Sequence, residues 1–193
     1  QVMEEQAVTI DGRTYPLPDP FFIIATMNLK GVHLFPLPAP QLDRFMIRLS
    51  LGYPTLEEEE AIIRRHGRDD GWAGFGPAVE SSDLVEWKRM VDQVTLHPEV
   101  TRYLTDCIRR TRSHPDIEVG GSPRSGVKIS RLVRALALCR GLDYVPPDFI
   151  KETFVPAMAH RIITRDPSIP PEAVLEEILS QVPVESPARS RRA

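Results

Sequence analysis

Asn28, Arg44 and Arg124 have side chains that could handle a phosphate group, and each adjoins a segment able to position it. Asn28 closely follows the apolar run FFIIAT (21–26), whose lack of polar alternation is typical of a strand buried on both faces of a parallel sheet. Ligands of such sheets bind beyond the carboxyl ends of the strands, where a carboxamide can contact a phosphate or an attacking water. Considered alone, however, Asn28 fits a turn better, because asparagine is common there for local hydrogen-bonding reasons.

The two arginines also lie in settings that favour an anionic partner. Arg44, in the string QLDRF, stands between Leu42 and Phe45, which can anchor the segment while the guanidinium points outward. Arg124, in the string GGSPRSG, lies at the start of a predicted helix, where free N–H groups and the helix dipole attract an anion. A salt bridge between domains is the alternative role for Arg124.

Three strings, ATMN, LPAPQLDRF and GGSPRSG, occur in this order and resemble the MoxR family of AAA+ ATPases. The resemblance covers about residues 1–165. It implies a sensor-1 role for Asn28, an arginine-finger role for Arg44 and a sensor-2 role for Arg124. The family usually reads ATQNP and LPEAQLDRF, so this sequence departs at variable places and keeps Asn28, Asp43 and Arg44.

The sequence contains no Gly-rich loop with Lys for the phosphates and Ser or Thr for magnesium. The nearest string, GSPRSGVK, fails because Val127 separates Gly126 from Lys128, and Ile129 replaces the hydroxyl residue. No predicted strand ends in paired acidic residues. We therefore expect the carboxyl-terminal portion of a longer ATPase, with ATP and Mg²⁺ held by upstream residues. Alone, the chain should bind ATP weakly or not at all and hold no metal.

Composition excludes some classes of function. The net charge of -3 and the pI of about 6.0 argue against binding to a nucleic-acid backbone. Apolar runs are too short for a membrane span, and no leader opens the chain, so a cytoplasmic protein is expected. Cys107 and Cys139 each fall in an apolar helical pattern, which predicts buried free thiols in a reducing compartment.

The pattern of elements predicts a mainly α fold in which a small α/β core remnant precedes a helical lid. Residues 1–53 would hold the remnant of an AAA+ core, with a hairpin at Asp11-Gly12, the sensor-1 strand and a last strand after Phe45. The lid would span 54–165. An additional helix would occupy 166–182, and a disordered tail 183–193.

Within the lid, helices are predicted by apolar spacing and by end signals. The first would be capped by Thr55 and end near Arg65, and later ones would follow Ser82, Pro98, Val127 and Pro147, while the additional helix beyond the lid would start at Pro171. The helix from Val127 should bury Leu132, Leu136 and Cys139. The helix after Pro147 should run on through Ile163, with a possible kink at Pro156.

Two classes of function remain open. The resemblance implies an ATPase ring, expected to be a hexamer, with a chaperone-like role on client proteins beside von Willebrand factor A domain partners. The alternative is a non-catalytic helical module that binds a client or adaptor through the aromatic loop at Trp72 and Phe75. Those two aromatics more commonly pack back onto the lid.

Overall fold

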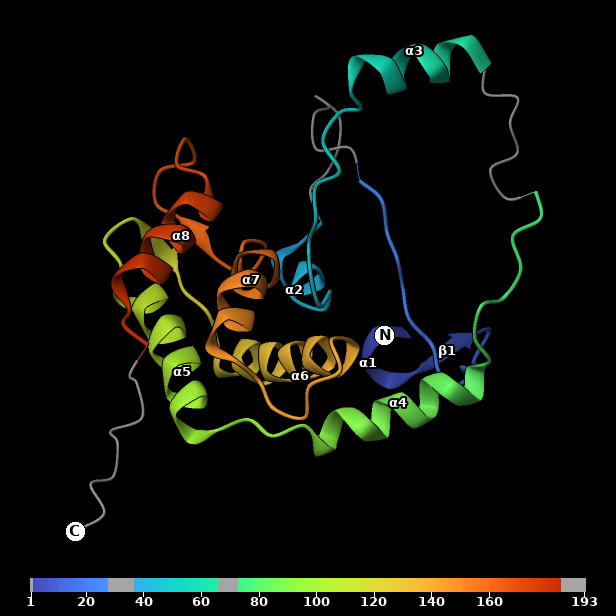
Figure 1. The fold of residues 1–193 in the computed structure, drawn as a ribbon, viewed down its shortest axis with the longest axis horizontal. Helices are drawn as coiled ribbons and strands as arrows, with labels where there is room; N and C mark the ends of the chain where they lie inside the picture. Colours follow the sequence, from blue (N-terminus) through green and yellow to red (C-terminus); the bar gives the residue numbers. More distant parts are fainter. Residues whose placement is uncertain (1, 28–36, 66–72, 185–193) are drawn as a thin grey trace.

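The amino-terminal part of the chain forms a short helix and a hairpin. In the computed structural model, which describes residues 2–27, 37–65 and 73–184, α1 (Val2–Glu5) leads into β1 (Ala7–Ile10), paired antiparallel with β2 (Arg13–Pro16) (Figure 1). Asp11 and Gly12 have φ values of 49° and 77°, the positive values that a type I′ turn requires. The predicted hairpin is confirmed.

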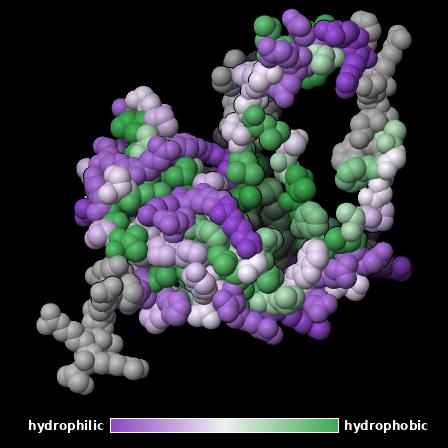
Figure 2. All heavy atoms as spheres, viewed as in Figure 1, coloured by the Kyte–Doolittle hydropathy of each residue, from purple (hydrophilic) through white to green (hydrophobic). Residues whose placement is uncertain are grey.

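The structure corrects the two other predicted core strands, because neither 21–26 nor 46–51 forms a strand. Phe22, Ile24 and Leu51 are 70%, 83% and 99% exposed. A strand needs a neighbour for its N–H and C=O groups, and among the described residues none lies beside either segment. Figure 2 shows hydrophobic side chains uncovered where these extended segments run.

Helix α3 (Leu56–Arg65) follows its predicted bounds and lies apart from the other helices (Figure 1). Its start is capped reciprocally: the N–H of Thr55 donates to a carboxylate oxygen of Glu58 at 2.9 Å, and the N–H of Glu58 to Thr55 Oγ1 at 3.4 Å. None of its residues is buried. Local capping and charge therefore define this helix, without core packing.

Five further helices follow α3 along the chain. They are α4 (Ser81–Gln93), α5 (Pro98–Ser113), α6 (Pro123–Cys139), α7 (Pro147–Met158) and α8 (Pro171–Gln181). Proline occupies the first position of α5 to α8, where its fixed φ suits a helix and its missing N–H costs nothing. Helix α6 packs against α4, α5 and α7, and α8 packs against α5 and α7 (Figure 1).

The core is built from one face of each of these last four helices. Completely buried side chains include Cys107 of α5, Ile129 and Val133 of α6, Phe154 of α7 and Leu175 of α8. Because α8 contributes to the same core, this extra helix docks on the lid. None of the helices in the described part of the chain is long and apolar enough to cross a bilayer.

The buried face of α6 differs from the predicted one by about one position along the helix. Ile129, Val133 and Ala137 are buried, whereas Leu132 and Leu136 only pack at the edge of the core. Cys139 is exposed, which corrects its expected burial, while Cys107 is buried as predicted. Each residue turns the helix by about 100°, so a one-residue shift changes which side chains face inward.

Two short strands, β3 (Ile117–Val119) and β4 (Ile163–Thr164), pair antiparallel and were not predicted. They link the end of α5 to the segment after α7. Helix α7 ends at Met158, short of its predicted end at Ile163, and Ile163 belongs instead to this strand pair.

Candidate functional site

The short helix α2 (Ala39–Leu42) leads Asp43 and Arg44 to the surface of the lid (Figure 1). Backbone turns continue after it, with the N–H of Arg44 donating to the carbonyl of Gln41 at 3.2 Å and that of Phe45 to the carbonyl of Leu42 at 3.1 Å. Asp43 and Arg44 are half-buried. We call residues 43–48 the finger segment.

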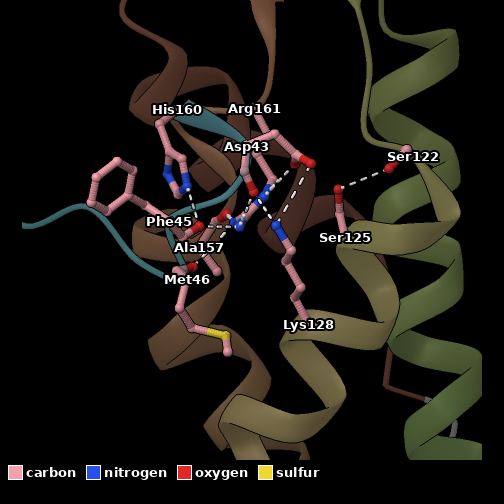
Figure 3. Close-up of polar contacts among 9 residues, drawn as sticks. All are labelled: Asp43, Phe45, Met46, Ser122, Ser125, Lys128, Ala157, His160 and Arg161. Carbon is pink, nitrogen blue, oxygen red and sulfur yellow. Dashed lines mark hydrogen bonds and ion pairs between the residues drawn. The ribbon is translucent and has the colours of Figure 1, made fainter. Parts of the chain in front are cut away.

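Arg161, just beyond α7, is the main contact of the finger segment (Figure 3). Its Nε donates to Asp43 Oδ1 at 2.9 Å, and its two Nη groups donate to the carbonyls of Asp43, Phe45, Met46 and Ala157. These contacts occupy all five N–H donors of the guanidinium. The Arg161 side chain is only 1% exposed. Its charge is therefore shielded from water and satisfied by protein groups.

Lys128 reaches the same carboxylate from α6. Its Nζ donates to the carbonyl of Asp43 and lies 3.6 Å from Asp43 Oδ2 (Figure 3). Burial lowers the pKa of Lys128, and the nearby cations Arg161 and Arg124 lower it further, while Asp43 opposes the shift. Asp43 thus stands between cations from two elements of the lid.

His160 and Arg48 complete the attachment of the finger segment. His160 Nε2 lies 3.2 Å from the carbonyl of Phe45. Burial, followed by the charge of Arg161, lowers the pKa of His160 to about 4, so the ring is neutral at pH 7 and Nε2–H can donate to that carbonyl. The N–H of Arg48 donates to the carbonyl of Pro156 at 2.9 Å, and its guanidinium pairs with Glu172 of α8.

Arg124 is the second residue of α6, and its side chain is exposed. The turn before it is packed tightly on α5: the N–H of Gly121 donates to Thr111 Oγ1 at 2.9 Å, and Arg112 Nε donates to the carbonyl of Gly121 at 2.6 Å. A Cβ added at Gly120 would lie 2.7 Å from the carbonyl oxygen of Thr111. The start of α6 is thereby fixed, with its free N–H groups and Arg124 at one end.

The structure brings two of the three predicted site residues to neighbouring places on the lid. Lys128, one turn after Arg124 on α6, contacts Asp43, which directly precedes Arg44. Asn28 and Trp72 lie outside the described residues, as does the tail from residue 185. Arg124, exposed at the amino terminus of α6, is placed where a phosphate could be contacted. In the described part of the chain, no cluster of three metal-ligating side chains occurs.

Sequence reasoning missed Arg161, Lys128 and His160 as site residues. A signal for two of them was present, because the polar pair His160-Arg161 interrupts an apolar stretch at the end of a core helix. Lys128 carries no such signal, since a lysine near a helix start is ordinarily a surface residue.

Two family models match this chain. Residues 109–181 match the AAA lid domain, and residues 1–47 match the ATPase family associated with various cellular activities. The chain is 33% identical to Chaperone MoxR1 of Mycobacterium tuberculosis over 94% of its own length and 52% of that protein. The chain corresponds to the carboxyl-terminal part of a MoxR-type AAA+ ATPase.

Two other proteins are also similar to this chain. The uncharacterized protein YeaC of Bacillus subtilis is 33% identical, with 95% of this chain and 59% of that protein covered. A crystal structure from Cytophaga hutchinsonii, described as "a putative ATPase", superposes with a TM-score of 0.83 at 29% identity and covers 96% of this chain and 60% of that one. The chain thus spans between half and two thirds of these relatives, and its mainly α fold with a small α/β portion is the expected one.

The two family matches divide the site between them. The AAA match contains Asn28, Asp43 and Arg44, and the lid match contains Arg124, Lys128 and Arg161. The contacts around Asp43 therefore join the two matched regions of a MoxR-type ATPase.

Proposed function

We propose that this chain is the sensing and lid portion of a MoxR-type AAA+ ATPase that hydrolyses ATP in a ring and uses the energy to remodel client proteins. The observation that carries the proposal is the attachment of the finger segment to the lid, through Asp43, beside the helix that bears Arg124. In this proposal, the attachment couples chemistry at the nucleotide to movement of the lid. A hexameric ring with client or von Willebrand factor A domain partners fits this function.

Each site residue takes a separate role in the proposal. Asn28 orients the attacking water within its own subunit, and Arg44 reaches the nucleotide of a neighbouring subunit. Phosphoryl transfer spreads negative charge over the γ-phosphate oxygens, which a guanidinium can stabilise. Arg124, at the positive end of the α6 dipole, reports the presence of phosphate to the lid. The phosphate loop and magnesium ligands come from sequence that this chain does not contain.

The role of Arg44 can be tested in a full-length ATPase that carries this segment together with a phosphate loop. Arg44→Ala should reduce turnover by roughly 10³- to 10⁵-fold while the Kd for ATP and ring formation change little. Arg131→Ala, at an exposed arginine of α6, is the matched control and should turn over normally.

Mixed rings decide whether Arg44 acts on a neighbour. Subunits lacking Arg44 should regain activity when combined with subunits that lack the phosphate loop but keep Arg44, because some interfaces then pair an intact pocket with an intact finger. If mixed rings form and stay inactive, Arg44 does not act in trans.

Arg124→Ala provides an independent test of nucleotide sensing. It should weaken ATP affinity or slow turnover while helical content stays unchanged, because the side chain is exposed and contributes little to the core. Unchanged ATP kinetics would reduce Arg124 to a structural residue. If both arginine variants retain full turnover, the helical interaction module becomes the better interpretation.

A further inference from the structure

Arg161 binds residues on both sides of Arg44, although it lies far from Arg44 in the sequence. Four of its five hydrogen bonds go to Asp43, Phe45 and Met46, the residue before Arg44 and the two residues after it. The fifth goes to the carbonyl of Ala157 at the end of α7. The backbone on both sides of Arg44 is therefore fixed to the lid by one side chain.

Burial and charge make this contact hard to replace. Because the Arg161 side chain is 1% exposed, water cannot take over its bonds, and Asp43 supplies the opposing charge. Lys128 binds the same aspartate from α6. A lysine ammonium carries three N–H donors on one nitrogen, whereas the guanidinium spreads five over a planar fork, so lysine at position 161 would keep the charge but could not reproduce all five contacts.

We propose that Arg161 is the positioning residue of Arg44, holding the finger segment to the lid so that the two move as one unit. The proposal rests on the proposed action of Arg44 on a neighbouring subunit. A lid that responds to phosphate at Arg124 then carries Arg44 with it, which transmits the nucleotide state of one subunit to the active site of the next.

The test uses Arg161→Lys in a full-length ATPase that carries this segment and a phosphate loop. A catalytic group displaced by about 1 Å can cost roughly 100-fold in rate, so kcat should fall between 10- and 100-fold while KM stays near its original value. Combining Arg161→Lys with Arg44→Ala should cost no more than Arg44→Ala alone. The control is Arg140→Lys, because Arg140 pairs with Glu152 on the exposed face of the same lid, and its kcat should be unchanged.

Mixed rings separate positioning from a general structural defect. Arg161→Lys subunits should fail to supply a finger to subunits that lack Arg44, yet they should hydrolyse ATP when their neighbours lack the phosphate loop and keep Arg44 and Arg161. A variant that is merely misfolded would fail in both arrangements. If Arg161→Lys subunits do not assemble into rings, Asp43→Glu replaces them in the test, because it keeps the charge but shifts the carboxylate. Asp43→Glu subunits should likewise fail to supply a finger and still hydrolyse ATP beside intact fingers.

The outcomes distinguish this proposal from the one on which it rests. Suppose that Arg44→Ala abolishes turnover. If Arg161→Lys then leaves kcat unchanged, fails in both mixed-ring arrangements, or lowers kcat further when combined with Arg44→Ala, Arg161 does not position the finger. The role of Arg44 stands in each of these cases. If Arg44→Ala turns over normally, both proposals are overturned.

Discussion

Removing the charge of Asp43 should strongly destabilise the lid. Asp43→Asn keeps the size of the side chain and leaves the Arg161 guanidinium, 1% exposed, without its carboxylate partner. Lys128, which also faces Asp43, then adds an unopposed positive charge close by. The perturbation therefore concerns a buried cation, although the residue that is changed lies near the surface.

The size of the effect follows from this geometry. Breaking a fully buried ion pair by removing one partner typically costs about 3–5 kcal/mol. The Asp43 side chain is 31% exposed, and Arg161 keeps its bonds to four backbone carbonyls, so both facts reduce the loss. We expect the free energy of unfolding to fall by about 2 kcal/mol, a value below that range because of this compensation.

Urea denaturation followed by helical circular dichroism measures this directly. With a slope of about 2 kcal/mol per molar urea, the midpoint should fall by about 1 M. Asp148→Asn is the control, because Asp148 pairs with Lys151 at 2.9 Å on an exposed surface and such pairs contribute only about 0.5 kcal/mol. Equal shifts for the two variants would show that the carbonyls alone satisfy Arg161, and the reasoning would be refuted.

Three further predictions concern the glycine turn, a buried histidine and the two thiols. Gly120→Ala should lower the free energy of unfolding by about 1–3 kcal/mol in thermal unfolding, since the added Cβ would contact the α5 backbone. Gly126→Ala is the control and should be nearly neutral, because its Cβ would contact only a side-chain methyl at 3.1 Å. The pKa of His160 is about 4 when folded and near 6.5 when unfolded, so the unfolded chain binds the extra proton and stability should fall as pH drops from about 6.5 to 4. His160→Gln should flatten that fall in urea titrations. At pH 8 a thiol reagent should label exposed Cys139 within minutes and leave Cys107 unlabelled until denaturant is added, because burial raises the Cys107 pKa to about 11.

The elements that could be predicted from sequence are those with local signals. Asp11-Gly12 predicted the hairpin, Thr55 the cap of α3, and Pro98 and Pro171 the starts of α5 and α8. Each depends on backbone preferences within a few residues, which no distant contact overrides here.

The features that could not be predicted depend on distant partners. The apolar run 21–26 indicates burial, but no strand among the described residues lies beside it, so it stays extended without pairing. Asp43 and Arg161 are far apart along the chain, and neither residue type nor spacing specifies that they meet. The same holds for Lys128. The sequence singled out the string QLDRF, which contains Asp43, but it gave no sign of the contacts that Asp43 makes with Arg161 and Lys128.

The end of α7 has its unpaired backbone groups satisfied in an unusual way. The last four carbonyls of a helix lack partners within it. In α7, those of Val155 and Met158 accept from the N–H groups of Ala159 and Arg161, while Pro156 and Ala157 accept from the Arg48 N–H and the Arg161 guanidinium. Fraying of this last turn would therefore release the finger segment, so amide exchange at the end of α7 should report how firmly Arg44 is held.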